Sequence, residues 1–251
     1  MLGLEGYLLA FIRFSTFLFA MPLLRQRGIP PQVKIGLAVF TAIAAAPSMT
    51  YEGDFAHEWV VLVVQEIGVG LLLAFVINLV FASIQFSGQL VDFPIGFGMA
   101  TVFDPQSGQQ LPVFSQFYNV LASVIFFAVD AHLWVLRALN QSYKYLPVNS
   151  FFTWEFTFQA FAELGKNLFG IGLQIAAPVI GTILLVDVAM GVVTRVVPQL
   201  HVFVMGFPIK NLLGLFVILL ALPAYVVLVA KLFAYDGIMM EIIWGLLQSG
   251  S

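Results

Sequence analysis

Long apolar segments separated by short polar ones make up most of the chain. Several of these segments approach or exceed the roughly 20 apolar residues that a helix needs to cross a bilayer. The pattern predicts an all-α integral membrane protein with about six hydrophobic helices, followed by a shorter amphipathic one. We expect them at about 2–24, 33–46, 59–85, 113–139, 168–193 and 211–232, with the amphipathic helix over 238–247.

One stretch, residues 86–117, is as apolar as its neighbours but is interrupted by residues that break helices. Asp92 and Asp104 lie within it, and it contains no Lys or Arg. Irregular backbone at membrane depth is tolerated only where protein buries it or where it lines a watery path. The stretch therefore indicates a pore, a gate or a binding site. Its glycines and prolines are Gly88, Gly96, Gly98 and Gly108 with Pro94, Pro105 and Pro112.

A second irregular stretch is expected over residues 195–210, which contain prolines and Gly206. Pro178 and Asp187 are expected to interrupt the segment at 168–193 in the same way, so that several segments are Gly/Pro-interrupted. In the fourth segment, Asp130 and Arg137 are seven residues apart, which predicts that they share one helix face.

The composition agrees with a membrane protein. Of 251 residues, 61% are hydrophobic and only 9% are charged, against about 25% charged in soluble domains. A net charge of −3 with few basic clusters argues against nucleic acid as a partner. The chain has no cysteine, which excludes disulfides and thiol chemistry. No linker divides the chain, so we expect a single membrane-embedded domain over 1–251.

Motifs for catalysis or cofactor binding are missing from the sequence. Asp130 and His132 are possible metal ligands, but no HExxH motif or further His cluster accompanies them, and a polar pair at a helix end is the favoured interpretation. The Gly96–Gly98 pair begins a GxGxxG motif, but position 101 is Thr. There is no GxSxG motif and no Walker A motif. We expect a protein that is not an enzyme and holds neither cofactor nor metal.

Four carboxylates lie in apolar segments: Glu66, Asp92, Asp130 and Asp187. Buried acids in a membrane are candidates for a proton or cation relay. Pairing with Arg13, Arg137 or Arg195 is the alternative, and it is favoured because no two acids have relay spacing. Large apolar side chains near the broken stretches form either a hydrophobic constriction or ordinary core packing, and packing is favoured. These side chains are Phe93, Phe97, Met99, Phe103, Met205 and Phe207.

The two irregular stretches resemble the motifs of the FliR family, the R subunit of the flagellar type III export gate. The similarity to its central motif lies in residues 89–92 (QLVD), 96–100 (GFGMA) and 104–110 (DPQSGQQ). Residues 198–200 (PQL) and 206–208 (GFP) resemble the second motif, and Arg13, Pro22 and residues 34–38 resemble the N-terminal pattern. The resemblance covers nearly the whole chain, with His201 departing from the family's more frequent Asn.

The resemblance implies a fold of broken helical hairpins in the bacterial cytoplasmic (inner) membrane, at the flagellar basal body. It implies a hetero-oligomer with FliP-type and FliQ-type gate subunits, onto which FlhB-type and FlhA-type subunits dock. Exported flagellar proteins pass through this assembly, membrane lipid surrounds it, and energy comes from the proton motive force and a separate ATPase. The implied role is structural and gating, in flagellar biosynthesis and protein export.

The resemblance also assigns residues to parts of the channel. The implied plug loop comprises Asp104, Pro105, Gln106, Ser107, Gly108, Gln109, Gln110 and Pro112. The implied constriction comprises Met205, Gly206 and Phe207, and the bent helix motif contains Asp92, Gly96, Gly98 and Met99. Two alternatives stay open: an injectisome counterpart of the R subunit, and a secondary transporter with discontinuous helices, although the paired repeats usual in transporters are not seen.

Overall fold

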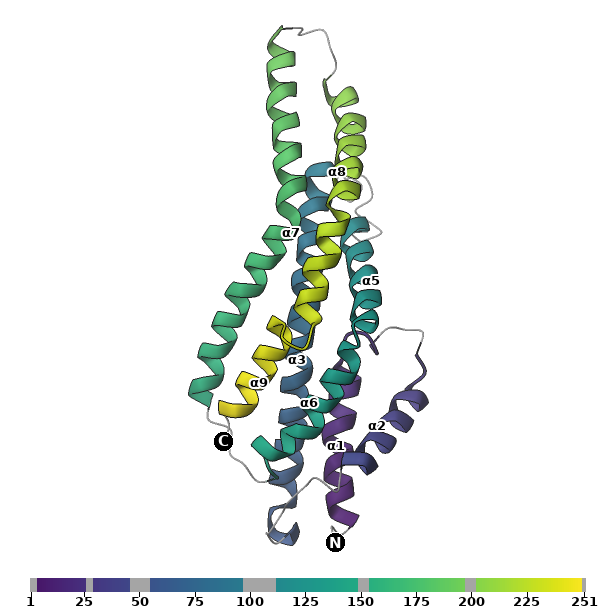
Figure 1. The fold of residues 1–251 in the computed structure, drawn as a ribbon, viewed down its shortest axis with the longest axis vertical. Coiled ribbons are helices and arrows are strands. Elements are labelled where there is room, and N and C mark those ends of the chain that lie inside the picture. The colour runs from purple at the N-terminus through teal and green to yellow at the C-terminus, as the bar shows by residue number, and fades with distance from the viewer. Residues whose placement is uncertain are drawn as a thin grey trace. The chain divides into compact units, whose positions relative to one another are not determined.

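The structure, a computed structural model, describes residues 4–25, 29–45, 55–96, 112–148, 154–196 and 202–249. These residues form helices and no strands (Figure 1), which confirms the all-α prediction. In chain order the helices are α1 (Leu4–Ala20), α2 (Pro31–Ala45), α3 (Phe55–Ile95), α5 (Val113–Ala128), α6 (Ala131–Tyr145), α7 (Trp154–Val196), α8 (Val202–Phe233) and α9 (Ile238–Ser249).

Three helical segments in the described part of the chain are long and apolar enough to cross a membrane. They are Trp59–Ile95 in α3, Gly165–Val196 in α7, and Gly206–Gln248, which includes most of α8 and α9. The bent pair α5 and α6 gives a fourth if it acts as one span. At 17 and 15 residues, α1 and α2 are short for a crossing. The membrane prediction is confirmed, with three or four helices of crossing length among the expected six.

Prolines interrupt the helices less than the sequence predicts. Pro94 lies within α3, and the helix continues to Ile95, so residues 86–95 of the first irregular stretch are helical. Pro178 lies within the continuous α7, which corrects the expected interruption there. Membrane helices tolerate proline because neighbouring helices and side chains satisfy the freed carbonyl groups.

The second irregular stretch is also shorter than predicted. The sequence places it over residues 195–210, but α7 continues to Val196 and α8 begins at Val202. Pro208 lies inside α8. Residues 202–210, including those of the predicted constriction, are therefore helical.

The sharpest break in the described helices lies at Asp130, where α5 and α6 meet at 70°. Asp130 has φ 56° and ψ 22°, the left-handed conformation, which Asp and Asn adopt more readily than other residues with a Cβ. Asp130 thus precedes α6, and the expectation that it shares a helix face with Arg137 is wrong. Arg137 instead lies over the Trp134 ring, 4.7 Å from its centroid.

Contacts group the chain into two compact units, and several helices pass from one unit to the other. The first unit comprises Met1–Val80, Phe126–Gly165 and Lys231–Ser251. Its core is mainly aromatic and aliphatic, and the rings of Phe126 and Phe233 meet edge to face at 5.1 Å. The single-domain assignment stays a prediction.

The second unit comprises Phe81–Ile125 and Lys166–Ala230. Here the rings of Tyr118 and Tyr225 stack at 4.7 Å, and the Tyr225 hydroxyl donates a hydrogen bond of 2.7 Å to the Tyr118 carbonyl. The rings of Phe86 and Phe169 meet edge to face at 5.1 Å. These aromatic pairs join α5 to α8 and α3 to α7 within the unit.

Candidate functional site

Asp92, from the predicted bent helix motif, lies in the last turn of α3 and is only 6% exposed. Its Oδ1 accepts a hydrogen bond of 2.9 Å from the backbone N–H of Phe114, and its Oδ2 accepts one of 3.1 Å from that of Ser115. Both donors belong to the first turn of α5, where N–H groups have no partner within the helix. Asp92 therefore caps a second helix, and its negative charge lies at the favourable end of that helix dipole.

Two other positions on α3 meet the same turn of α5. A Cβ added to Gly88 would lie 2.2 Å from the Ser115 Cα, so only glycine allows the two backbones to approach this closely. The Ser115 hydroxyl donates a hydrogen bond of 3.0 Å to the Gln85 carbonyl. The start of α5 is thus fixed against one face of α3 by three successive contacts.

The end of α3 meets α8. Gly96 follows the helix with φ +106°, a conformation that glycine adopts without strain. A Cβ on Gly96 would lie 2.9 Å from Cδ2 of Phe207, and one on Gly214 would lie 2.7 Å from Cδ1 of Ile95. The structure thereby places one residue of the predicted bent motif in contact with one residue of the predicted constriction.

The other residues assigned from the sequence fall in three groups. Gly98, Met99 and residues 104–110 of the plug loop lie outside the described residues, as do Phe97 and Phe103. Pro112 immediately precedes α5, and Met205 and Gly206 lie on α8. Phe93 is 81% exposed and Phe207 is 45% exposed, so the expectation of core packing is wrong for Phe93.

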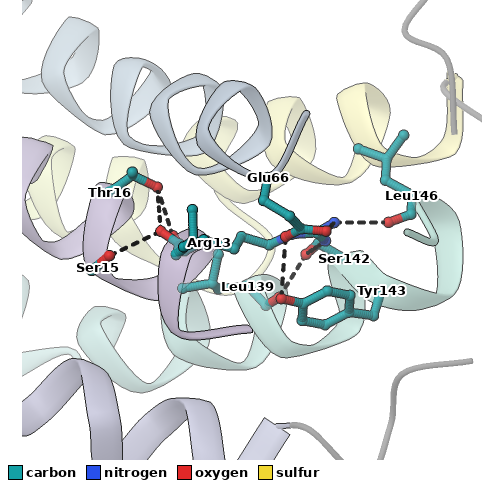
Figure 2. A network of polar contacts seen from close by, with 9 residues as sticks. Arg13, Ser15, Thr16, Glu66, Leu139, Ser142, Tyr143 and Leu146 are labelled. Carbon is teal, nitrogen blue, oxygen red and sulfur yellow. Dashed lines mark hydrogen bonds and ion pairs between the residues drawn. The ribbon is translucent and has the colours of Figure 1, made fainter. Parts of the chain in front are cut away.

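A separate polar site lies in the first unit, around Arg13 and Glu66, each about 1% exposed (Figure 2). Arg13 Nε donates to Glu66 Oε2 at 2.6 Å and Nη2 donates to Oε1 at 2.9 Å. The same guanidinium donates to the Ser142 hydroxyl at 2.8 Å and to the Leu146 carbonyl at 3.2 Å. It lies 3.8 Å from the centre of the Tyr143 ring. Paired, forked hydrogen bonds of this type are among the strongest between side chains.

This Arg13 network joins α1, α3 and α6. The predicted pairing of Glu66 with an arginine is confirmed, which removes Glu66 from the acids available for a relay in this conformation. Close packing supports the network, because a Cβ on Gly70 would lie 2.1 Å from Thr16 Oγ1 and 2.6 Å from the Arg13 carbonyl oxygen. The network is a structural connection between three helices.

The remaining acids differ from their predicted pairing. Asp187 on α7 forms an ion pair with Lys210 on α8, where pairing with Arg195 was among the expectations. Asp130 makes no side-chain capping hydrogen bond to α6. His132 Nδ1 is buried without a hydrogen-bond partner, and its ring lies 5.3 Å from that of Phe127. Within the described ranges, no group of three or more His, Asp or Glu is placed to hold a metal ion.

The expected pairing of Asp92 with Arg13, Arg137 or Arg195 is wrong, because its partners are the backbone N–H groups of Phe114 and Ser115. The sequence marked Gly88 only as a helix breaker and gave Ser115 no role. One signal was available, because Pro112 is typical of the first turn of a helix and the residues after it supply free N–H groups. Those groups need an acceptor, and Asp92 is an acid with no base in its own stretch.

Known proteins resemble the chain over most of its length. Residues 4–235 match the family described as "Bacterial export proteins, family 1". The flagellar biosynthetic protein FliR of Pectobacterium carotovorum is 35% identical over 215 residues, which cover 85% of this chain and 82% of that protein. FliR of Bacillus subtilis is 34% identical, covering 91% and 90%. The Shigella flexneri surface presentation of antigens protein SpaR is 28% identical, covering 83% and 81%.

Proposed function

The chain belongs to the FliR family of bacterial export proteins, and from that premise we propose that it is a structural and gating subunit of the flagellar type III protein-export channel. Similarity over most of the chain to proteins named for flagellar biosynthesis supports this role. The 35% and 34% identities to FliR proteins favour the flagellar branch, while the 28% identity to SpaR lies within the range of other FliR proteins, 22–35%, and leaves an injectisome counterpart as the alternative.

The observation that carries the gating role is the meeting of α3 with α5 at Asp92 and with α8 at Gly96. Gly96 and Pro112 are the two described residues that bound positions 97–111, and Gly96 contacts Phe207. We propose that Asp104 to Gln110, with Pro112, form the plug of the closed channel. Met205, Gly206 and Phe207 form its constriction, and an apolar ring such as that of Phe207 opposes the passage of water and ions.

The proposed partners are FliP-type and FliQ-type subunits in a hetero-oligomer, with FlhB-type and FlhA-type subunits docking onto it. The surface of α7 and α8 supports burial in a larger assembly. Its exposed side chains are mostly apolar, yet Asp187 and Lys210 lie among them, 44% and 26% exposed. A charged pair facing lipid is costly, so contact with protein or a watery path suits this face better.

The proposed site of action is the cytoplasmic (inner) membrane at the flagellar basal body, where exported flagellar proteins pass the subunit. We propose that the chain itself catalyses no reaction and acts through its shape. The transporter alternative draws little support from Asp92, because both carboxylate oxygens already accept backbone hydrogen bonds and are occupied.

Co-expression tests this function. The chain is tagged and produced with FliP-type and FliQ-type subunits of one flagellar system, and the purified material is measured by native mass spectrometry. We expect one copy of the chain in a complex with several copies of both partners. A chain that purifies alone, is stable, and binds a small solute would contradict the proposal and favour a transporter.

A further inference from the structure

Asp92 joins α3 and α5 in the second unit through its two backbone hydrogen bonds. Its neighbours on α3 reinforce the contact, since Gln85, Gly88 and Asp92 are spaced by three and four residues and so lie on one helix face. All three meet Ser115 on α5. The first turn of α5 therefore has one defined position on the last turns of α3, which lie close to it in Figure 1.

The same contact fixes the position of Gly96 relative to Pro112. Gly96 lies four residues after Asp92, and Pro112 lies two residues before Phe114. Asp92 accepts hydrogen bonds from Phe114 and Ser115. Any separation of α5 from α3 therefore breaks these two hydrogen bonds before it changes the distance between Gly96 and Pro112. Gly96 also contacts Phe207, so its position is linked to that of α8.

We propose that Asp92 is a positioning residue of the gate: its carboxylate holds the start of α5 on α3 and so keeps Gly96 and Pro112 at the spacing that the closed channel requires. We call Asp92 with the N–H groups of Phe114 and Ser115 the Asp92 latch. The inference rests on the gating function proposed above. It assigns to this acid a mechanical role in closure, distinct from proton or cation transfer.

The test uses the assembled gate complex carrying Asp92→Asn. An amide keeps the size of the side chain, but its NH₂ group cannot accept a hydrogen bond, so one of the two bonds is lost. The chain has no cysteine, which allows spin labels at Phe93→Cys and Val120→Cys, positions 81% and 50% exposed in this chain. Electron paramagnetic resonance then reports the distance distribution between α3 and α5, and dye release from vesicles reports the leak.

We expect Asp92→Asn to broaden the distance distribution and to raise the leak of the closed gate about tenfold, the factor that a loss of about 1.4 kcal/mol produces. Gly88→Ala provides an independent second variant, because its Cβ would push against Ser115 without removing the carboxylate. It should have the same two effects. The matched control is Gly181→Ala, where a Cβ meets nothing within 4 Å.

The outcomes separate the latch from the function on which it rests. Unchanged distance distributions in both Asp92→Asn and Gly88→Ala would overturn the latch. If the distance distributions broaden but the complex releases no dye, the positioning role of Asp92 is overturned, provided that a complex lacking residues 106–110 does release dye in the same assay. If that deletion is also sealed in an assembled complex, the proposed gating function itself fails.

Discussion

Arg13→Ala is expected to destabilise the protein strongly, because it leaves Glu66 charged and buried without its partner. The substitution removes two hydrogen bonds to Glu66, one to Ser142 and one to the Leu146 carbonyl, and it also removes the contact with the Tyr143 ring. Removal of one partner from a buried ion pair typically costs about 3–5 kcal/mol. We expect Arg13→Ala to lower the free energy of unfolding by an amount in that range.

The double variant Arg13→Met with Glu66→Met separates the cost of a lone charge from the value of the pair. Replacement of a whole buried pair by apolar side chains is often neutral or stabilising. Here Ser142 keeps its hydrogen bond to the Leu139 carbonyl, whereas the Leu146 carbonyl and the Tyr143 hydroxyl each lose a partner. Each group left unsatisfied costs about 1–3 kcal/mol. The double variant should therefore be less stable than wild type but should recover part of the stability that Arg13→Ala loses.

The assay is thermal unfolding of the purified complex in detergent, followed by the fluorescence of the chain's four tryptophans and by loss of the native mass. Arg13→Met, Glu66→Met and the double variant complete a double-mutant cycle. If the stability losses of the two single variants add up to that of the double variant, Arg13 and Glu66 are not coupled, and the network does not connect α1, α3 and α6 as a unit. The reasoning from burial would then be refuted.

Two further predictions concern positions with matched controls. Gly70→Ala should lower stability by about 1–3 kcal/mol, as overpacking usually does, because its Cβ would press on the Arg13 carbonyl. The control Gly68→Ala has nothing within 4 Å of its Cβ. It should be neutral or slightly stabilising in the same melting assay. Asp130→Gly and Asp130→Asn should retain wild-type stability, whereas Asp130→Val should lose about 1–2 kcal/mol to the left-handed backbone. Equal melting temperatures for Asp130→Val and Asp130→Asn would contradict the conformational argument.

The sequence predicted the helices well and their breaks poorly. Apolar runs located the described helices, because burial of such runs in lipid or protein requires internal hydrogen bonding. Proline was a misleading signal: Pro94, Pro178 and Pro208 all lie within helices. The sharp bend at Asp130 has no glycine or proline at its turn, and only the preference of Asp for left-handed backbone marks it.

The polar residues of the site were partly predictable. A basic residue in an apolar segment requires an acid, so the pairing of Arg13 with Glu66 could be foreseen as one of several combinations. For Asp92, Pro112 indicated that free N–H groups follow it, but the pairing itself joins residues 22 and 23 positions apart and depends on how α3 and α5 pack. Contact between Gly96 and Phe207 likewise depends on packing between distant segments.

The most direct test of the gating role is the permeability of the assembled export gate in vesicles, measured with a small fluorescent dye. We expect the wild-type complex to be sealed, deletion of residues 106–110 to leak while native mass confirms intact assembly, and Phe207→Ala to leak to a smaller degree. A fully assembled complex that stays sealed after the deletion would contradict the assignment of this segment as the plug and, with it, the proposed gating function.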